Sequence, residues 1–134
     1  MSIADPSYFS REVARVYAEL PINADHFTQV RRAKKLMETH LHENIDLSEM
    51  AKTAGMSGAH FIRIFRQVYG MAPRKFLRDL RLSQAKSLLI QGLPVTEVCL
   101  AVGYESLPTF SNAFKRGMGQ SPQAFQKHNK SNPE

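Results

Sequence analysis

The chain has 134 residues, of which 43% are hydrophobic, and its formal net charge is +6. This length supplies one core of ordinary size, so we expect a single compact unit. The only cysteine, Cys99, excludes a disulfide framework, and no apolar run is long enough to cross a membrane. The N-terminus also lacks the basic start and apolar core of a signal peptide, so we expect a soluble cytoplasmic protein.

The positive charge is concentrated in the later part of the chain. From residue 52 to residue 130 there are 12 Lys and Arg side chains against only three acidic ones, a local net charge of +9. An excess of this size usually faces a polyanion, and it favours a nucleic acid as the partner.

The first 22 residues are expected to form an N-terminal extension that contains one amphipathic helix. Ser7 can cap this helix, and Pro21 ends it. Its apolar face, with intervals of three and four residues, consists of Phe9, Val13, Val16, Tyr17 and Leu20. Two interpretations remain open: the helix packs on the body of the domain, or it binds a partner or a second copy.

A second helix is predicted from Asn23 or Asp25 to about His42. Its predicted buried side chains are Phe27, Val30, Leu36, Met37 and Leu41. Its predicted solvated face is basic and consists of Arg31, Arg32, Lys34 and Lys35.

Residues 47–69 have the layout of a helix-turn-helix motif. Asp46 and Glu49 have the spacing of a capping box, and Gly55 suits the left-handed conformation that ends a short helix. Ser57 can then cap a second helix. The predicted buried side chains of that second helix are Phe61, Ile64, Phe65 and Val68.

A long helix is predicted from Pro73 to about residue 91, where the sequence Gly92-Leu93-Pro94 stops it. At about 1.5 Å per residue, this helix spans nearly 30 Å. A last helix begins at Pro122, and we expect fraying from Lys127 and a polar tail at residues 129–134.

One pattern occurs on both sides of the long helix. The residues Phe61, Phe65, Arg66, Gly70, Pro73 and Phe76 recur 49 positions later as Phe110, Phe114, Lys115, Gly119, Pro122 and Phe125. Upstream, Leu47, Glu49, Met50, Ala51 and Gly55 recur 48 positions later as Val95, Glu97, Val98, Cys99 and Gly103. The repeat predicts a second helix-turn-helix at residues 95–117, with Cys99 as a buried apolar side chain, and two small subdomains around a shared helix.

With these intervals, the chain resembles the DNA-binding domain of the AraC/XylS family of bacterial transcription regulators, over roughly residues 23–127. The most specific parts of the match are Gly70 to Leu82, and Val95 to Gly103 with the following Tyr104, Phe110, Phe114 and Pro122. The resemblance implies an all-α domain, placed here at residues 23–128, in which two helix-turn-helix units joined by a long helix enter the major groove of one DNA segment. Since family members generally carry a further domain, we expect a small standalone regulator, or alternatively a DNA-binding fragment of a larger ligand-responsive one.

Base contacts are expected from outward positions of the second helix of each unit. The candidates are Ala59, Ile62 and Arg63 in the first unit, and Leu107, Pro108, Ser111 and Asn112 in the second. Arg63 can bond both O6 and N7 of a guanine, and the resemblance implies a base reader at this position; the alternative is a phosphate contact only. Asn112 occupies a place where the family commonly has arginine, so the second unit is expected to contribute less to specificity.

Phosphate contacts are expected from helix N-termini, where unpaired amides and the helix dipole favour anions, and from nearby cations. The candidates are Ser57, His60, Arg66, Arg74, Lys75, Arg78, Ser106, Thr109, Lys115, Ser121 and Gln123. Arg116 is a further possible phosphate contact. Some of the polar residues would instead serve as plain helix caps.

Nothing in the sequence indicates catalysis or a cofactor. His40 and His42 point apart on a helix, and Cys99 has no cysteine partner, so no metal site is expected. We expect an activator that binds double-stranded DNA as a monomer and contacts RNA polymerase. The alternative is a protein-interaction module, which the apolar Ala59, Ile62, Leu107 and Pro108 favour.

Overall fold

The computed structural model describes residues 22–129, and within this range every regular element is an α-helix. The elements are α2 (Ala24–Thr39), α3 (Leu47–Ala54), α4 (Gly58–Tyr69), α5 (Pro73–Ile90), α6 (Val95–Ala101), α7 (Leu107–Met118) and α8 (Pro122–Asn129). The all-α fold is therefore confirmed. The amphipathic helix predicted between Ser7 and Pro21 lies outside the described residues.

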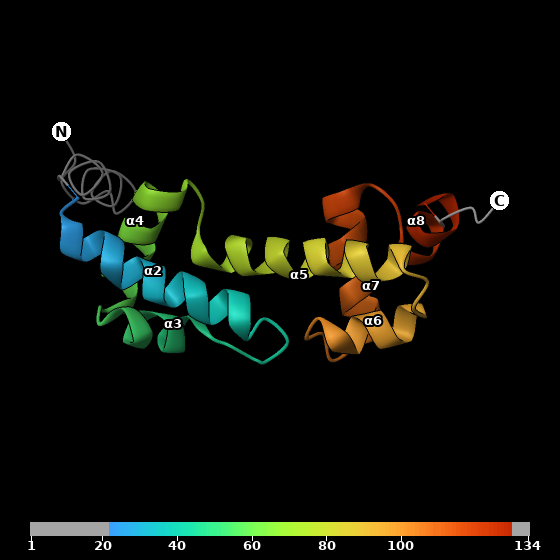
Figure 1. Cartoon of the computed structure of the whole chain (residues 1–134), viewed down its shortest axis with the longest axis horizontal. Helices are drawn as coiled ribbons and strands as arrows, with labels where there is room; N and C mark the ends of the chain where they lie inside the picture. Colours follow the sequence, from blue (N-terminus) through green and yellow to red (C-terminus); the bar gives the residue numbers. More distant parts are fainter. Residues whose placement is uncertain (1–21, 130–134) are drawn as a thin grey trace, which may run out of the picture.

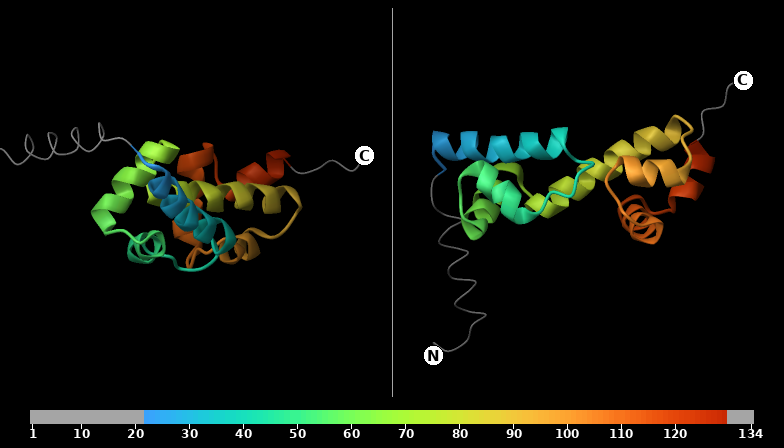
Figure 2. Two further views of the ribbon diagram at one scale, coloured as in Figure 1. Left: turned by 60° about the vertical axis from the view of Figure 1, so that its left-hand side comes forward. Right: turned by 90° about the horizontal axis from the view of Figure 1, so that it is seen from below.

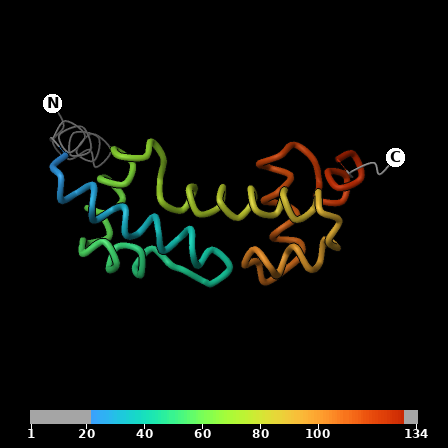
Figure 3. The backbone as a smooth tube through the Cα atoms, in the orientation of Figure 1, coloured from blue at the N-terminus to red at the C-terminus, as the bar shows by residue number. Residues whose placement is uncertain are grey.

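The described helices form an elongated molecule organised along α5. Helices α2, α3 and α4 gather at one end of α5, and α6, α7 and α8 gather at the other (Figure 1). The tube in Figure 3 shows that α5 runs from one group to the other without a break. The prediction of two helix-turn-helix subdomains joined by a long helix is confirmed.

Each subdomain has a core of its own, and the sequence repeat becomes a repeat of ring contacts. Phe65 meets Phe76 edge to face with ring centroids 5.4 Å apart, and Phe114 meets Phe125 in the same way at 5.3 Å. Helix α5 contributes Leu77 to the first core, whereas its later residues Leu82, Ala85 and Leu89 belong to the second core. Helix α5 thus contributes side chains to both cores, and the other helices of each subdomain contribute the rest.

Local capping explains where several helices begin. Asp46 Oδ1 accepts a hydrogen bond from the Glu49 amide at 2.8 Å, and Ser57 Oγ accepts one from the His60 amide at 3.3 Å. Gly55 follows α3 with a φ of 72°, in the left-handed conformation predicted for it. These side chains satisfy amides that have no partner within the helix.

The end of α2 and the position of Phe27 were predicted wrongly. The helix ends at Thr39, three residues before His42. Phe27 was expected in the core but is 45% exposed, because His26 faces α4 at this turn, with its ring 5.4 Å from that of His60. The buried stripe of α2 is instead Val30, Ala33 and Met37.

Further corrections concern side chains in and just after α2, and the last described helix. Leu36 and Leu41 are only partly buried, and Lys34 lies over the ring of Tyr69, 5.2 Å from its centroid, instead of being fully solvated. Fraying from Lys127 is also wrong, because α8 continues to Asn129, whose Nδ2 donates to the Phe125 carbonyl at 2.9 Å.

Candidate nucleic-acid interface

Helix α4 has one buried face and one outward face. Phe61, Ile64 and Phe65 are buried, and the helical period places Ala59 and Arg63 together on the opposite side. Ala59 is exposed and Arg63 is partly exposed. Two of the candidate base readers of the first unit, Ala59 and Arg63, therefore share an outward face.

Two other candidates extend the outward face of α4 to its sides. Ile62 is partly buried and lies nearer the core than Arg63, whereas Arg66 is exposed one turn before the end of the helix. His60 is partly buried against His26, so its ring is engaged by α2 rather than directed only at solvent.

Helix α7 repeats this division, with Phe110 and Phe114 buried and Asn112 exposed. Pro108 is exposed in the first turn, and Leu107 keeps 36% of its surface exposed. Ser111 is partly buried, because it lies closer to the core side of the helix than Asn112 does. The outward face of the second unit thus centres on Asn112.

The two helices are presented by the molecule in a similar way. Figure 1 shows that α4 lies beside the start of α5, that α7 crosses α5 in its later half, and that both helices begin at the same long edge of the molecule. In the right-hand view of Figure 2, α7 lies below α5, whereas α2 lies above it. The 18 residues of α5 extend over roughly 27 Å, which is comparable with the ~34 Å between successive major grooves.

Three of the candidate phosphate-binding residues are helix caps. Ser106 Oγ accepts a hydrogen bond from the Thr109 amide at 3.2 Å and donates to Thr109 Oγ1 at 2.7 Å. Ser121 Oγ accepts from the Ala124 amide at 3.1 Å, as Ser57 does from His60. These three serines therefore have a structural role as caps. They lie at the N-termini of α4, α7 and α8, where backbone amides have no partner within the helix.

The cations at the start of α5 differ in their availability. Lys75 Nζ lies 2.8 Å from Asp79 Oδ2, so its charge is partly compensated. Arg74 and Arg78 are exposed on the same helix, and Arg78 lies one turn after Arg74. Gln123 is exposed on α8, at the end of the molecule formed by the second subdomain.

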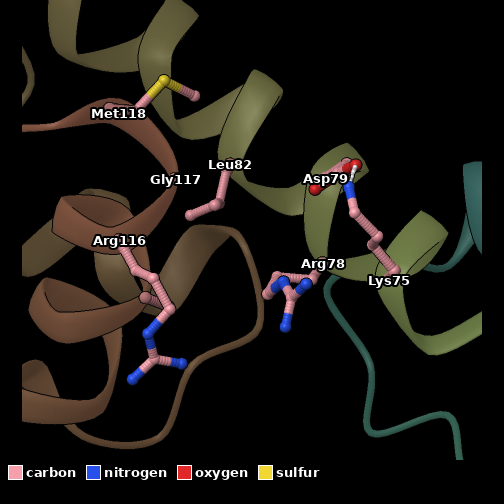
Figure 4. Close-up of a pocket in the computed structure, with 8 residues that line it drawn as sticks. Lys75, Arg78, Asp79, Leu82, Arg116, Gly117 and Met118 are labelled. Atoms are coloured by element: carbon pink, nitrogen blue, oxygen red, sulfur yellow. Dashed lines mark hydrogen bonds and ion pairs between the residues drawn. The ribbon is translucent and has the colours of Figure 1, made fainter.

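A groove lies between α5 and α7, with a volume of about 430 Å³. Figure 4 shows the guanidinium groups of Arg78 and Arg116 extending toward the same open space. Lys115 is exposed beside Arg116 on α7. The convergence of Arg78 and Arg116 on one groove could not be deduced from the sequence, because the two residues come from different helices. The only local signal was the spacing of four residues from Asn112 to Arg116, which places these two side chains on the same face of α7.

Beside this groove, α7 packs closely on α5. A Cβ atom added at Gly117 would lie 2.8 Å from Leu82 Cδ1. A small residue at position 117 therefore allows this close packing.

The described residues contain no group of three or more His, Cys, Asp and Glu side chains able to hold a metal ion. Cys99 is buried and donates weakly from its Sγ to the Tyr104 carbonyl at 3.7 Å. Burial raises the pKa of the Cys99 thiol, which keeps it in the unreactive protonated form. Within residues 22–129, no helix is long and apolar enough to cross a bilayer.

The two helix-turn-helix units each present the outward face of their second helix, α4 or α7. This arrangement is typical of transcription regulators that bind DNA through helix-turn-helix motifs. A family described as a helix-turn-helix domain matches residues 50–128. The chain belongs to this family, which is the AraC-type group of DNA-binding transcription regulators.

Curated relatives agree with this membership. The HTH-type transcriptional regulator GlxA of Rhizobium meliloti is 40% identical over 87 residues, which are 64% of this chain and 27% of that protein. The right origin-binding protein of Escherichia coli K12 is 33% identical over 92 residues, which are 68% of this chain and 32% of that protein. The chain therefore spans about a third or less of the length of these relatives.

Solved structures are similar over most of the described range. The C-terminal domain of AraT, a response regulator from Geobacillus stearothermophilus, has a TM-score of 0.75 and 29% identity, covering 78% of this chain and 88% of that one. The DNA-binding domain of the global transcriptional factor AdpA, solved in complex with a target DNA, has a TM-score of 0.71 and 33% identity, covering 74% and 90%.

Proposed function

We propose that the chain regulates transcription by binding one DNA segment as a monomer, with α4 and α7 in successive major grooves. The observation that carries this proposal is the shared presentation of the two helices at the ends of α5, with Arg63 and Asn112 at equivalent outward positions. The AdpA domain, which has the same fold, was solved bound to its target DNA and supports a DNA-binding role.

The proposed base contacts come from the outward faces of α4 and α7. Arg63 would donate to O6 and N7 of a guanine, whereas the uncharged Asn112 would make a weaker base contact. Ala59 and Ile62 would pack on thymine methyl groups, as would Leu107. Pro108 and Ser111 would lie at the edge of this contact surface.

The proposed phosphate contacts surround these faces. The cations among them are Arg66, Arg74, Lys75, Arg78, Lys115 and Arg116. The polar residues at or near helix starts are Ser57, His60, Ser106, Thr109, Ser121 and Gln123. Phosphate contacts position the protein, whereas the base contacts supply specificity.

The direct test is binding at several salt concentrations. A preferred site is first selected from random duplexes, and the protein is then titrated onto that labelled site and onto a scrambled duplex of equal length and composition. We expect a specific affinity at least about a thousandfold above nonspecific binding. Equal affinity for the two duplexes would contradict the proposal.

We further propose that the regulator is an activator that contacts RNA polymerase and acts on the nucleoid in the bacterial cytoplasm. Transcription with purified polymerase, from a promoter that carries the selected site, tests this step. The expected result is more transcript in the presence of the protein, and a decrease would identify a repressor.

A second candidate is a protein-interaction module. The observation that favours it is the apolar surface of the second subdomain, where Leu100 of α6 is 68% exposed and Leu107 is 36% exposed. The same titration separates the two functions, since a module of this kind would bind DNA weakly and without preference for sequence.

A further inference from the structure

Arg81 of α5 joins segments that lie far apart in the sequence. Its Nε donates to the carbonyl oxygen of Leu41 and one terminal nitrogen donates to that of Glu43, both at 2.7 Å. Both carbonyls belong to the loop between α2 and α3, in the first subdomain. A charged donor that forms two such bonds holds this loop firmly on the middle of α5.

The same guanidinium reaches the second subdomain. Its carbon lies 5.8 Å from the ring centroid of Tyr104, a residue in the turn between α6 and α7. Burial lowers the pKa of Arg81 from its ordinary value and raises that of Tyr104, as expected where both side chains are partly withdrawn from water. Arg81 therefore lies where the loop, α5 and the second turn converge.

Gly103 makes an independent contact at the same place. A Cβ atom built on Gly103 would lie 2.8 Å from the Leu41 carbonyl oxygen and 3.0 Å from that of His42. Its φ of 92° also belongs to the region that favours glycine. The turn of the second helix-turn-helix is thus seated directly on the loop of the first subdomain.

Leu41, Arg81, Gly103 and Tyr104 form a junction between the two subdomains. The side chain of Leu41 belongs to it because it packs against the buried residues of both cores. Elsewhere the first core reaches α5 near Leu77, and the second core reaches it from Leu82 onward. Without these contacts, the orientation of one subdomain relative to the other would depend mainly on how each packs on α5.

We infer that this junction, formed by Leu41, Arg81, Gly103 and Tyr104, fixes the relative orientation of α4 and α7 and so sets the spacing between the two half-sites that the protein accepts. Arg81 is a positioning residue in this scheme, because its hydrogen bonds are directed at the protein. The spacing step rests on the proposed function, whereas the orientation step does not depend on DNA.

The orientation step is tested without DNA by pulsed dipolar spectroscopy between two spin labels. In a Cys99→Ala background, which copies Ala51 of the first repeat, labels are attached at the exposed positions Lys35→Cys on α2 and Lys127→Cys on α8. The parent should give one narrow distance distribution. Arg81→Gln should broaden or shift it, whereas Lys86→Gln, at an exposed cation on the same helix outside the proposed contacts, should leave it unchanged.

An unchanged distribution in a helical Arg81→Gln protein would overturn the inference. If Arg81→Gln does not fold, Gly103→Ala decides the question by the same measurement, because its added methyl group pushes the turn off the loop. A narrow distribution at the parent distance in Gly103→Ala would then overturn it.

The spacing step is tested on duplexes with one base pair inserted or removed between the half-sites. Relative to the parent, Arg81→Gln should lose about tenfold in affinity at the preferred spacing but much less at the altered spacings. An equal loss at every spacing would assign Arg81 to DNA contact or stability and would overturn the proposal. If the parent itself binds no preferred site, the proposed function fails, and the spin labels still report on the junction.

Discussion

Gln126 Nε2 lies 3.0 Å from the carbonyl oxygen of Leu89, so that a side chain of α8 meets the end of α5. The same nitrogen donates to the Leu93 carbonyl at 2.7 Å. The Leu89 carbonyl also accepts from the Gly92 amide at 3.0 Å, so Gln126 adds a second donor there and donates to Leu93 just beyond the end of α5. Gln126 therefore fastens the last described helix to the central one.

We predict that Gln126→Ala lowers the free energy of unfolding by about 1 to 3 kcal/mol, because two partly buried hydrogen bonds between α8 and the end of α5 are lost. Urea unfolding followed by circular dichroism measures this. Gln123→Ala is the matched control, since Gln123 is exposed on the same helix, and it should change the free energy by less than about 0.5 kcal/mol. Equal effects of the two substitutions would show that the bonds of Gln126 contribute little.

A second prediction concerns Arg63. Its replacement by Ala should weaken specific binding by about 1 to 3 kcal/mol and relax the preference at one base pair, as expected for the loss of a bidentate guanine contact. Affinities for the selected site and for its single-base variants at fixed salt test this. A uniform loss on all sequences would instead make Arg63 a phosphate contact.

Arg78 is expected to behave differently. Arg78→Ala should weaken binding to all sequences alike and reduce the slope of log affinity against log salt by roughly one unit. Lys86→Ala provides the control, because Lys86 is an exposed cation of the same helix outside the proposed contacts. If the slope remains at the parent value in Arg78→Ala, this residue does not contact DNA.

The two halves of the bound site should be unequal. Base substitutions under α4 should each cost about 1 to 3 kcal/mol, whereas those under α7 should cost clearly less, because Asn112 supplies no charge where α4 has Arg63. A scan of every base pair, with affinity measured at one salt concentration, tests this. Comparable penalties in both halves would mean that Asn112 pairs with adenine and that Leu107 packs on thymine methyls as effectively.

Cys99 gives a prediction for alkaline pH. Burial raises the pKa of its thiol in the folded protein, so the unfolded chain loses this proton first, near pH ~8.5. This contribution to the free energy of unfolding is fully present below that pH and is lost as the pH rises through the folded pKa. Urea unfolding between about pH 7 and 9.5 should show the fall, and Cys99→Ala should reduce it. A parallel fall in both proteins would exclude Cys99 as the cause.

The local features of the fold could be predicted because they depend on neighbours in the sequence. The ends of α5 followed from Pro73 and from Gly92 to Pro94, and the start of α4 followed from Ser57. The outward faces of the two recognition helices, α4 and α7, followed from the period of their buried phenylalanines. Phe27 was misplaced because periodicity identifies an apolar face but does not show how far the neighbouring helices cover it.

By itself, the sequence determined the helices, their caps, the repeated helix-turn-helix and the equivalence of Arg63 with Asn112, since all of these depend on residues a few positions apart. The tertiary structure alone decided the convergence of Arg78 and Arg116 on one groove, the contact of Gln126 with Leu89, and the junction at Arg81. Arg81 and Leu41 are 40 positions apart, and only the packing of both subdomains on α5 brings them within hydrogen-bond distance.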